Sequence, residues 1–288
     1  MSGLFELPKL AQSEILPLPS DSGALANRIN QATRSSHNKI NNLINLKIIF
    51  ALRDYRIYRQ GIQSFYHVFS TFEECWKREM EKDTDIGHIL KEVWTPAMAR
   101  TDPLINDLMF YYSNDKSKFA TPVMPEQVAF AEHIRKVTSD KPHLLLAYGH
   151  VMYLALFAGG RILRSSIMKS SGLFPQMDGL TTEEVATKGT NLFRFQVDDE
   201  DNLRASFKTK FELQTRNNLT EQEKKDIIEE SQEIFRRNTA CISEIEKKNR
   251  KAVMEKYGYK ALRAAKIFLI ALLCFVAFYI LRRTTLLF

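Results

Sequence analysis

The sequence predicts an all-α protein, with one helical domain followed by an apolar helix near the C-terminus. After Asp21, apolar residues recur at three- and four-residue spacings along most of the chain, which is the period of an amphipathic helix. No run alternates strictly between apolar and polar residues as a half-exposed strand does, and no tandem repeat occurs. Positions 267–281 hold fifteen uncharged, mostly apolar residues, the usual composition of a membrane-spanning or deeply buried helix.

The elements follow in order from local signals. Residues 1–22 carry three prolines and little periodicity, so we expect a loose arm. The first helix is expected to start at Asp21 or Ser22 as N-cap, with an apolar stripe running to Ile40. A capping box opens the last helix of the domain at Thr220, which continues toward Tyr257. Between them we expect helices over 57–77, 86–98, 103–112, 125–137 and from Pro142 toward Ser170, with 172–203 irregular.

Composition limits the class of protein. The chain has 288 residues, of which 44% are hydrophobic and 26% charged, enough for one sizeable core. Residues 261–288 contribute four basic side chains and no acid, so the other 260 residues hold 37 basic against 34 acidic ones. A domain so close to neutrality has no global basic surface, and we expect no nucleic-acid partner. Three widely spaced cysteines form no disulfide or zinc pattern, which indicates a reducing compartment.

The apolar segment predicts a membrane anchor. Eighteen residues, 264–281, span about 27 Å as a helix, close to the thickness of an endoplasmic reticulum bilayer. Two basic residues stand on each side of its apolar centre, and seven residues follow it in this sequence. We therefore expect a single C-terminal anchor in the endoplasmic reticulum membrane with the domain in the cytosol; the alternative is a buried core helix. The expected division is 1–22 arm, 23–250 helical domain, 251–263 basic linker, 264–281 transmembrane helix and 282–288 short lumenal tail.

His37 is the strongest candidate for chemistry among six histidines. The chain has no HExxH, no phosphate-binding loop and no GxSxG turn, which argues against zinc hydrolases, nucleotide-dependent enzymes and acyl transfer. On a helical wheel His37 lies at the border of the apolar stripe, with Arg34 and Asn41 on nearly the same side. Such a histidine can ligate a metal held in a large apolar ligand whose acid group meets the arginine. The alternative is a solvated helix face that happens to include a histidine.

Small residues interrupt the long helix that follows Pro142. Ala155, Ala158, Gly159 and Gly160 remove side chains from one stretch, and two adjacent glycines cost about 2 kcal/mol relative to alanine. Either another helix crosses closely there, or the backbone is laid open to a flat ligand.

Five segments together resemble the heme oxygenase family, and most closely its fungal branch. Gln31–His37 is similar to the proximal helix that supplies the axial histidine, and Leu154–Gly160 to the distal helix with its "GDLSGG" signature. Three further segments resemble the family in the same order, so that the likeness covers about residues 23–250 and the C-terminus: Ser64–Glu74, Thr121–Met124 and Ile228–Phe235. The resemblance implies one helical domain that holds heme between its proximal and distal helices.

The resemblance also implies roles for individual residues. His37 would bind the heme iron, and Arg34 with Lys208 or Lys210 would hold the heme propionates. Gly159 and Gly160 would be the distal glycines over the porphyrin. The remaining matches at or near the pocket are Tyr153, Phe193, Phe195, Phe235 and Asn238, while a family lysine is Asn30 here and a family tyrosine is His150.

The distal signature departs from the family at two positions. Ala155 replaces a glycine, and Leu156 replaces the aspartate that orders the waters delivering protons to bound oxygen. The implied function is a heme oxygenase with heme b as cofactor and substrate and O2 as co-substrate. Electrons would come from NADPH–cytochrome P450 reductase, and the products would be biliverdin, CO and ferrous iron, for heme degradation and iron recovery. Because of Leu156, a heme-binding sensor or buffer with little turnover is the alternative; a third possibility is a helical scaffold without a ligand.

Overall fold

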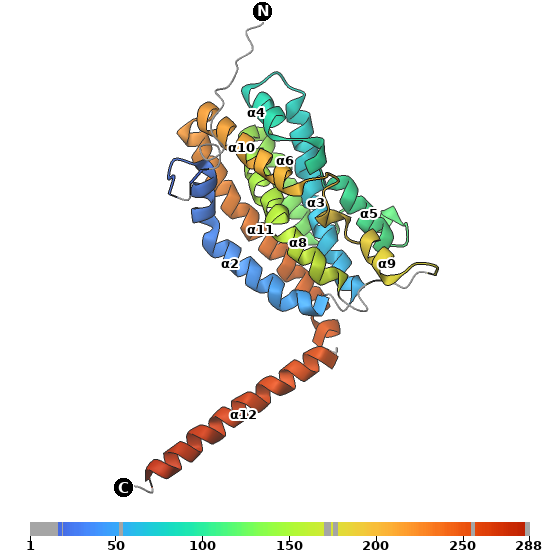
Figure 1. The fold of residues 1–288 in the computed structure, drawn as a ribbon, viewed down its shortest axis with the longest axis vertical. Helices are drawn as coiled ribbons and strands as arrows, with labels where there is room; N and C mark the ends of the chain where they lie inside the picture. The colour runs from blue at the N-terminus through green and yellow to red at the C-terminus, as the bar shows by residue number, and fades with distance from the viewer. Residues whose placement is uncertain are drawn as a thin grey trace, which may run out of the picture.

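The computed structural model describes residues 17–18, 20–51, 54–169, 174, 178–254 and 257–285, and most of the expected arm lies outside them. The described residues contain no strand, which confirms the all-α prediction. Figure 1 shows a bundle of helices from which one long helix projects. Apart from the run from Pro142 to Met168, which is described below, the α-helices are α2 (Leu25–Ala51), α3 (Tyr55–Met80), α4 (Asp85–Val93), α5 (Thr101–Tyr111), α6 (Pro125–Asp140), α9 (Thr182–Lys188), α10 (Glu200–Asn218), α11 (Glu221–Met254) and α12 (Tyr257–Thr285) in the described residues.

Helix α3 runs through the core, and α11 packs along α2. Helices α4, α5 and α6 contact α3, whose Phe69, Phe72 and Trp76 are almost completely buried. Helix α11 contacts α2, α3 and α6, and α10 crosses to contact both α2 and α8 (Leu154–Met168). Burial of these aromatic side chains stabilises the bundle, since each fully buried ring removes a large apolar area from water.

The run from Pro142 to Met168 is continuous but not uniform. A 3-10 turn, η3 (Pro142–Leu144), leads into α7 (Leu145–Tyr148), a π turn, η4 (Gly149–Tyr153), and then α8. Gly149 is needed at the π turn, because a Cβ there would lie 2.9 Å from the Trp76 ring. In the searched residues this run alone is long and apolar enough to cross a membrane, yet 78% of its most apolar window is buried within the protein. It is a core helix.

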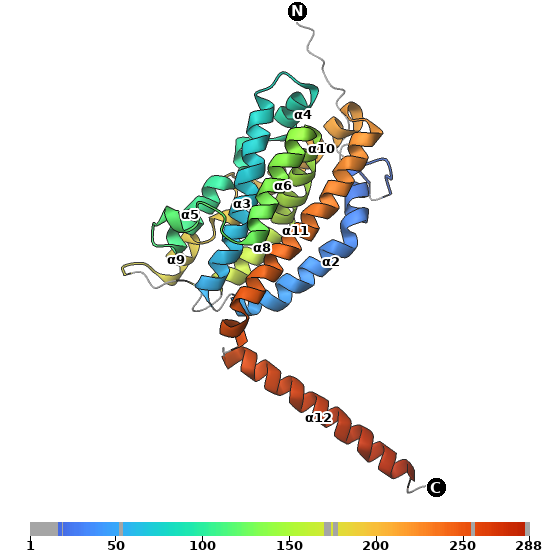
Figure 2. The same ribbon diagram turned by 180° about the vertical axis from the view of Figure 1, so that it is seen from behind.

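Helix α12 leaves the bundle, as Figures 1 and 2 show from opposite sides. Residues 260–277 are all exposed, and large apolar side chains among them, from Ile267 to Val276, show between 44% and 71% of their surface. The expected helix over the apolar segment is therefore present, and the bundle does not cover it.

Three local expectations were wrong. The helix expected over 86–98 ends at Val93, because Pro96 disfavours helical backbone at the residue before it and opens a 3-10 turn instead. The first helix begins at Leu25, since Asp21 instead forms a turn in which its carboxylate accepts from the Gly23 N–H at 2.9 Å. The segment expected to be irregular contains α9 and the 3-10 turn η5 (Asn191–Phe193), and α10 begins within it.

Candidate functional site

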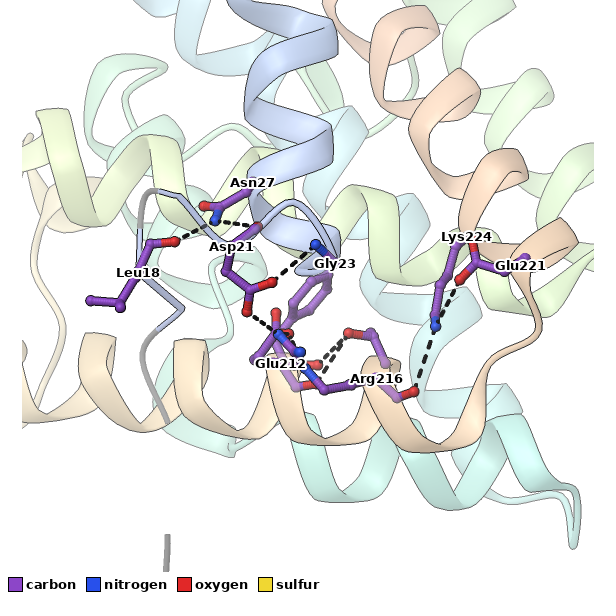
Figure 3. A network of polar contacts seen from close by, with 10 residues as sticks. Leu18, Asp21, Gly23, Asn27, Glu212, Arg216, Glu221 and Lys224 are labelled. Atoms are coloured by element: carbon purple, nitrogen blue, oxygen red, sulfur yellow. Dashed lines mark hydrogen bonds and ion pairs between the residues drawn. The ribbon is translucent and has the colours of Figure 1, made fainter. Parts of the chain in front are cut away.

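Ion pairs hold the turn that precedes α2 against α10 (Figure 3), and the start of α2 against α11. Arg216 of α10 reaches Asp21 at 2.6 Å and also pairs with Glu212 on its own helix. Nearby, Arg28 of α2 contacts Glu221 of α11 at 2.9 Å. These partly exposed contacts are individually weak, but they converge from three segments and so set the position of α2.

One face of α2 is buried and the other is open. Ile29, Thr33 and Ile40 are buried, whereas Arg34 and His37 are exposed. This is the amphipathic pattern expected from the sequence, and it places the arginine and the histidine one turn apart on the same open side.

The imidazole of His37 is held at one nitrogen. The Asn41 side-chain amide lies 3.3 Å from His37 Nδ1, and the ring of Phe235 from α11 meets the imidazole edge-on, with centroids 6.0 Å apart. No hydrogen bond links His37 Nε2 to another described residue. In a metal-ligating histidine the ring nitrogen away from the metal donates its N–H to a second group, so Asn41 would serve His37 in that way through its amide oxygen, with the amide turned over from the orientation seen here.

Helix α8 presents a strip of small residues. Ala155 and Ala158 are exposed, Ile162 shows 70% of its surface, and a Cβ built at Gly159 would have no atom within 4 Å. No neighbouring helix therefore crosses α8 at Gly159, and of the two explanations for the small residues the open face for a flat ligand is favoured. Gly160 differs, because a Cβ there would meet Phe193 at 3.8 Å.

Leu156 faces the core rather than the open strip. Only 8% of its surface is exposed, while Ala155 beside it is exposed. The leucine that replaces the family's aspartate is thus packed with the buried apolar residues.

Helices α2 and α8 are joined near one end of the site. Asn30 Oδ1 of α2 lies 3.3 Å from His150 Nε2 in the π turn that precedes α8. His37 lies seven residues beyond Asn30 on α2, which is a rise of about 10 Å along the helix axis. Gly159 lies nine residues beyond His150, which is a rise of about 13 Å. Both helices run from there toward the α12 end of the bundle (Figure 1). His37 and Gly159 therefore lie at similar heights on the two helices.

Unpaired nitrogen atoms gather at this joined end. His150 is 3% exposed, its Nδ1 has no partner in the described residues, and burial together with nearby Lys208 lowers its pKa to about 3. Lys208 of α10 is half-buried, and burial and Arg204 lower the pKa of its ammonium group. No ion pair to Lys208 occurs in the described part of the chain, so an acid group entering here would meet an uncompensated cation. Lys210, two residues on, is also half-buried.

Tyr153 lies behind the open strip, in the core. Its hydroxyl donates to Glu73 Oε1 at 2.9 Å and accepts from Trp94 Nε1 at 3.2 Å. Glu73 also accepts from the Arg100 N–H at 2.7 Å. The hydroxyl of Tyr153 is therefore used inside the fold, and its ring packs against Phe69 and Phe72 of α3.

A buried arginine, Arg100, braces α8, and no sequence pattern predicted it. Arg100 is 2% exposed; Nη1 donates to the Arg194 carbonyl at 2.6 Å, and the guanidinium stacks on Phe195 at 4.1 Å. Phe195 in turn stacks on Phe157 of α8, with ring centroids 4.5 Å apart. Burial lowers the pKa of Arg100 to about 10, well above the neutral range, so the group stays charged.

The fold and the site define a helical protein with an accessible histidine on one helix and exposed small residues on a second helix at a similar height. The chain belongs to the heme oxygenase family, whose model, described as heme oxygenase, matches residues 23–244. This confirms the resemblance seen in the sequence.

Relatives of known name cover most of the chain. Heme-binding protein HMX1 of Saccharomyces cerevisiae is 37% identical over 270 residues, covering 88% of this chain and 84% of the yeast protein. Heme oxygenase 1 of Synechocystis is 26% identical over 226 residues, covering 77% of this chain and 85% of its own.

Solved structures share the fold. The crystal structure of Synechocystis heme oxygenase-1 in complex with heme superimposes with a TM-score of 0.65 at 22% identity, covering 84% of this chain and 99% of that one. A heme oxygenase from Leptospira interrogans gives a TM-score of 0.62 at 23% identity, covering 77% of this chain and 99% of that chain.

Proposed function

We propose that this protein is a heme oxygenase that cleaves heme b to biliverdin, CO and ferrous iron with O2 and electrons from NADPH–cytochrome P450 reductase. One observation carries the proposal: within a heme oxygenase fold, His37 Nε2 has no hydrogen-bond partner and the α8 strip has no covering element among the residues that the structure describes. The role would be heme degradation and iron recovery.

The residues present fit a heme. His37 would hold the iron through Nε2, while Asn41 fixes the other ring nitrogen. Arg34 and Lys208, with Lys210 nearby, would meet the propionates, since neither Arg34 nor Lys208 has an ion pair among the described residues. The missing side chain at Gly159 would let the porphyrin approach the helix backbone. When bound, heme would supply both the iron that activates O2 and the ring that is oxidised.

Proton delivery would differ from a site with a distal carboxylate. Leu156 neither accepts nor relays protons, and it is packed into the core. Waters held by backbone groups along the exposed strip at Ala155 and Gly159 would have to carry protons instead. The apolar residues around Leu156 would keep other water out of the core behind the strip. Slow turnover with biliverdin as product is the result this arrangement favours.

A heme sensor or buffer is the second candidate, and Leu156 is the observation that favours it. One relative, from yeast, is itself named a heme-binding protein. Adding reductase and NADPH to the heme-loaded protein separates the two. Loss of the Soret band together with the appearance of biliverdin absorbance supports the oxygenase. A heme spectrum that stays intact after many equivalents of NADPH rejects it.

His37→Ala tests the site itself. The variant should keep its helical fold, because the imidazole is exposed and meets only the edge of the partly buried Phe235, and should lose the axial-histidine spectrum of bound heme. His88→Ala is the matched control, since His88 is also exposed and lies on α4. If His37→Ala and wild type gave the same heme spectrum, His37 would be removed from the site.

We also propose that residues 264–281 anchor the protein in the endoplasmic reticulum membrane with the heme-binding domain in the cytosol. The exposed apolar side chains of α12 and its departure from the bundle support this, because an uncovered apolar helix is costly in water. Alkaline carbonate extraction and protease protection of a C-terminal tag test it. Release by carbonate, or a digested tag, would reject the anchor.

A further inference from the structure

The net charge of the chain is concentrated in one short segment. Residues 247–266 hold eight basic side chains and one acidic one, a balance of +7, which equals the net charge of the whole chain. The other 268 residues therefore carry 33 basic and 33 acidic side chains. A protein that is otherwise neutral has a single strongly positive segment, and it stands where the domain meets α12.

The basic side chains at the end of α11 point into solvent. Lys247, Lys248, Arg250 and Lys251 are all exposed, and none forms an ion pair with another described residue. Elsewhere on α11 arginines do pair with acids: Arg236 and Arg237 both contact Glu233. Three of the four exposed cations, Lys247, Arg250 and Lys251, fall within about 100° of arc on the helix, so they form one face.

The start of α12 continues the positive surface. Lys260, Arg263 and Lys266 are exposed and follow one another every three residues, within about 120° of arc. Lys260 stands about 10 Å along the helix axis before the apolar run that begins at Ile267. That distance is comparable to a phospholipid headgroup layer and to the Debye length of about 8 Å at physiological ionic strength.

We propose that the exposed cations of residues 247–251 and 260–266 bind the anionic phospholipid headgroups of the membrane that receives α12. The proposal rests on the anchor proposed above and goes beyond it, because an apolar helix alone would not distinguish an anionic bilayer from a neutral one. Unpaired cations close to the surface are attracted to anionic lipids, and the attraction falls off over a Debye length. Since the rest of the chain is neutral, the attraction acts on this segment and turns the α12 end of the bundle toward the bilayer.

A competition between two vesicle populations tests the proposal with the full-length chain. Vesicles of phosphatidylcholine, and vesicles in which about a third of the lipid is phosphatidylserine, are mixed in equal lipid amounts and carry different dyes. Protein is added from detergent, the vesicles are separated by flotation, and bound protein is measured in each. We expect wild type to favour the anionic vesicles about tenfold or more at physiological salt and to lose most of that preference at about 0.5 M salt.

Two quadruple variants complete the experiment. Lys247, Lys248, Arg250 and Lys251 are changed to Gln in one, and the preference should fall to about threefold or less. The matched control changes four exposed lysines that have no ion pair in the described chain, Lys77, Lys91, Lys116 and Lys136, to Gln and should keep the wild-type preference.

Each outcome is decisive. Equal distribution of wild type between the two vesicle types overturns the lipid proposal and assigns the segment to an acidic protein surface instead. An equal loss of preference in both variants also overturns it, because the effect would then be one of total charge. Failure to float with either vesicle rejects the anchor itself, a separate result.

Discussion

At the scale of single residues, the candidate site has an exposed half, formed by α2 and α8, and a buried half whose contacts hold those helices in place. His37, Arg34 and the small residues of α8 were predicted from helical spacing and local pattern. The contact of Asn30 with His150, 120 positions apart, and the bracing of Phe195 by Arg100 were not. Nothing near Arg100 in the sequence distinguishes it from a solvated arginine, since its partners are backbone carbonyls that only the fold brings together.

Leu156→Asp should destabilise the protein rather than simply restore a family feature. The side chain is 8% exposed, so a carboxylate there is buried among apolar groups at a cost of about 2–4 kcal/mol. The free energy of unfolding of the heme-free protein, from chemical denaturation, measures this. Ala155→Asp is the matched control, since Ala155 is exposed and should change stability by less than about 1 kcal/mol. A fully stable Leu156→Asp protein would mean that waters or a rearranged helix reach that position, and biliverdin formation should then be faster than in wild type.

Protonation of buried histidines should make the heme-free protein sensitive to acid. Burial lowers the pKa of His150 to about 3 and that of His67 to about 4, from 6.5 in each case. Between these values the unfolded chain binds protons that the folded chain does not. The stability of the folded state is therefore complete above about pH 6.5 and is lost as pH falls.

His150→Phe isolates one of these two groups. Protonation of each histidine in the unfolded chain should lower the free energy of unfolding by about 2 kcal/mol between pH 7 and pH 5. The free energy of unfolding of the variant should therefore fall by about 2 kcal/mol less than that of wild type over this range. Phenylalanine fits the same aromatic contact with Phe211. Unfolding curves at the two pH values give the comparison; identical acid losses in both proteins would show that His150 is protonated without unfolding.

At the scale of elements, α8 shows why a glycine pair need not have one cause. The two glycines occupy adjacent positions, yet Gly159 faces open space and Gly160 faces Phe193. The sequence predicted that the pair mattered and left two explanations open. The packing favours the ligand explanation at Gly159 only, since a Cβ at Gly160 would lie at an ordinary contact distance from Phe193 of η5; the two glycines differ because neighbouring residues on a helix point about 100° apart.

Gly159→Leu should separate ligand binding from stability. No atom lies within 4 Å of the new Cβ, and leucine is the better helix former by about 1 kcal/mol, so the heme-free fold should be as stable as wild type or more so. Heme affinity, measured by Soret titration, should fall tenfold or more because the side chain fills the open strip. Gly160→Leu should behave in the opposite way, by displacing Phe193 and lowering stability. Unchanged heme affinity in Gly159→Leu would place the ligand elsewhere.

At the scale of the whole molecule, the helical bundle and α12 are separable. All residues from 260 to 277 are exposed, so α12 contributes no described side chain to the core. Deleting residues 261–288 should release a helical domain that stays in solution without detergent and binds heme as the full chain does. Circular dichroism and heme titration check this. A truncated domain that aggregates or loses heme binding would show that the last helix belongs to the folded core.

The all-α class could be predicted because it depends on periodicity, which is a local property of the chain. The detailed course of residues 172–203 could not, since α9 has only seven residues and α10 is charged on several sides, so neither has a clear apolar stripe. Those elements are held by partners distant in sequence, such as Asp107, which accepts hydrogen bonds from the backbone of Asn191 and Leu192.

Helix α11 links the two ends of the protein. It carries Phe235 against the imidazole of His37, and it continues without a break to Met254, just before α12 begins. Nineteen residues separate those positions, a rise of about 28 Å. With α12 in a bilayer, this rod and the first turns of α12 would together act as a spacer that limits the height of the proposed iron site above the membrane. A reductase fixed in the same membrane would have to present its electron-donating group within that height, so the length of these helices would select which redox partners could reach the heme.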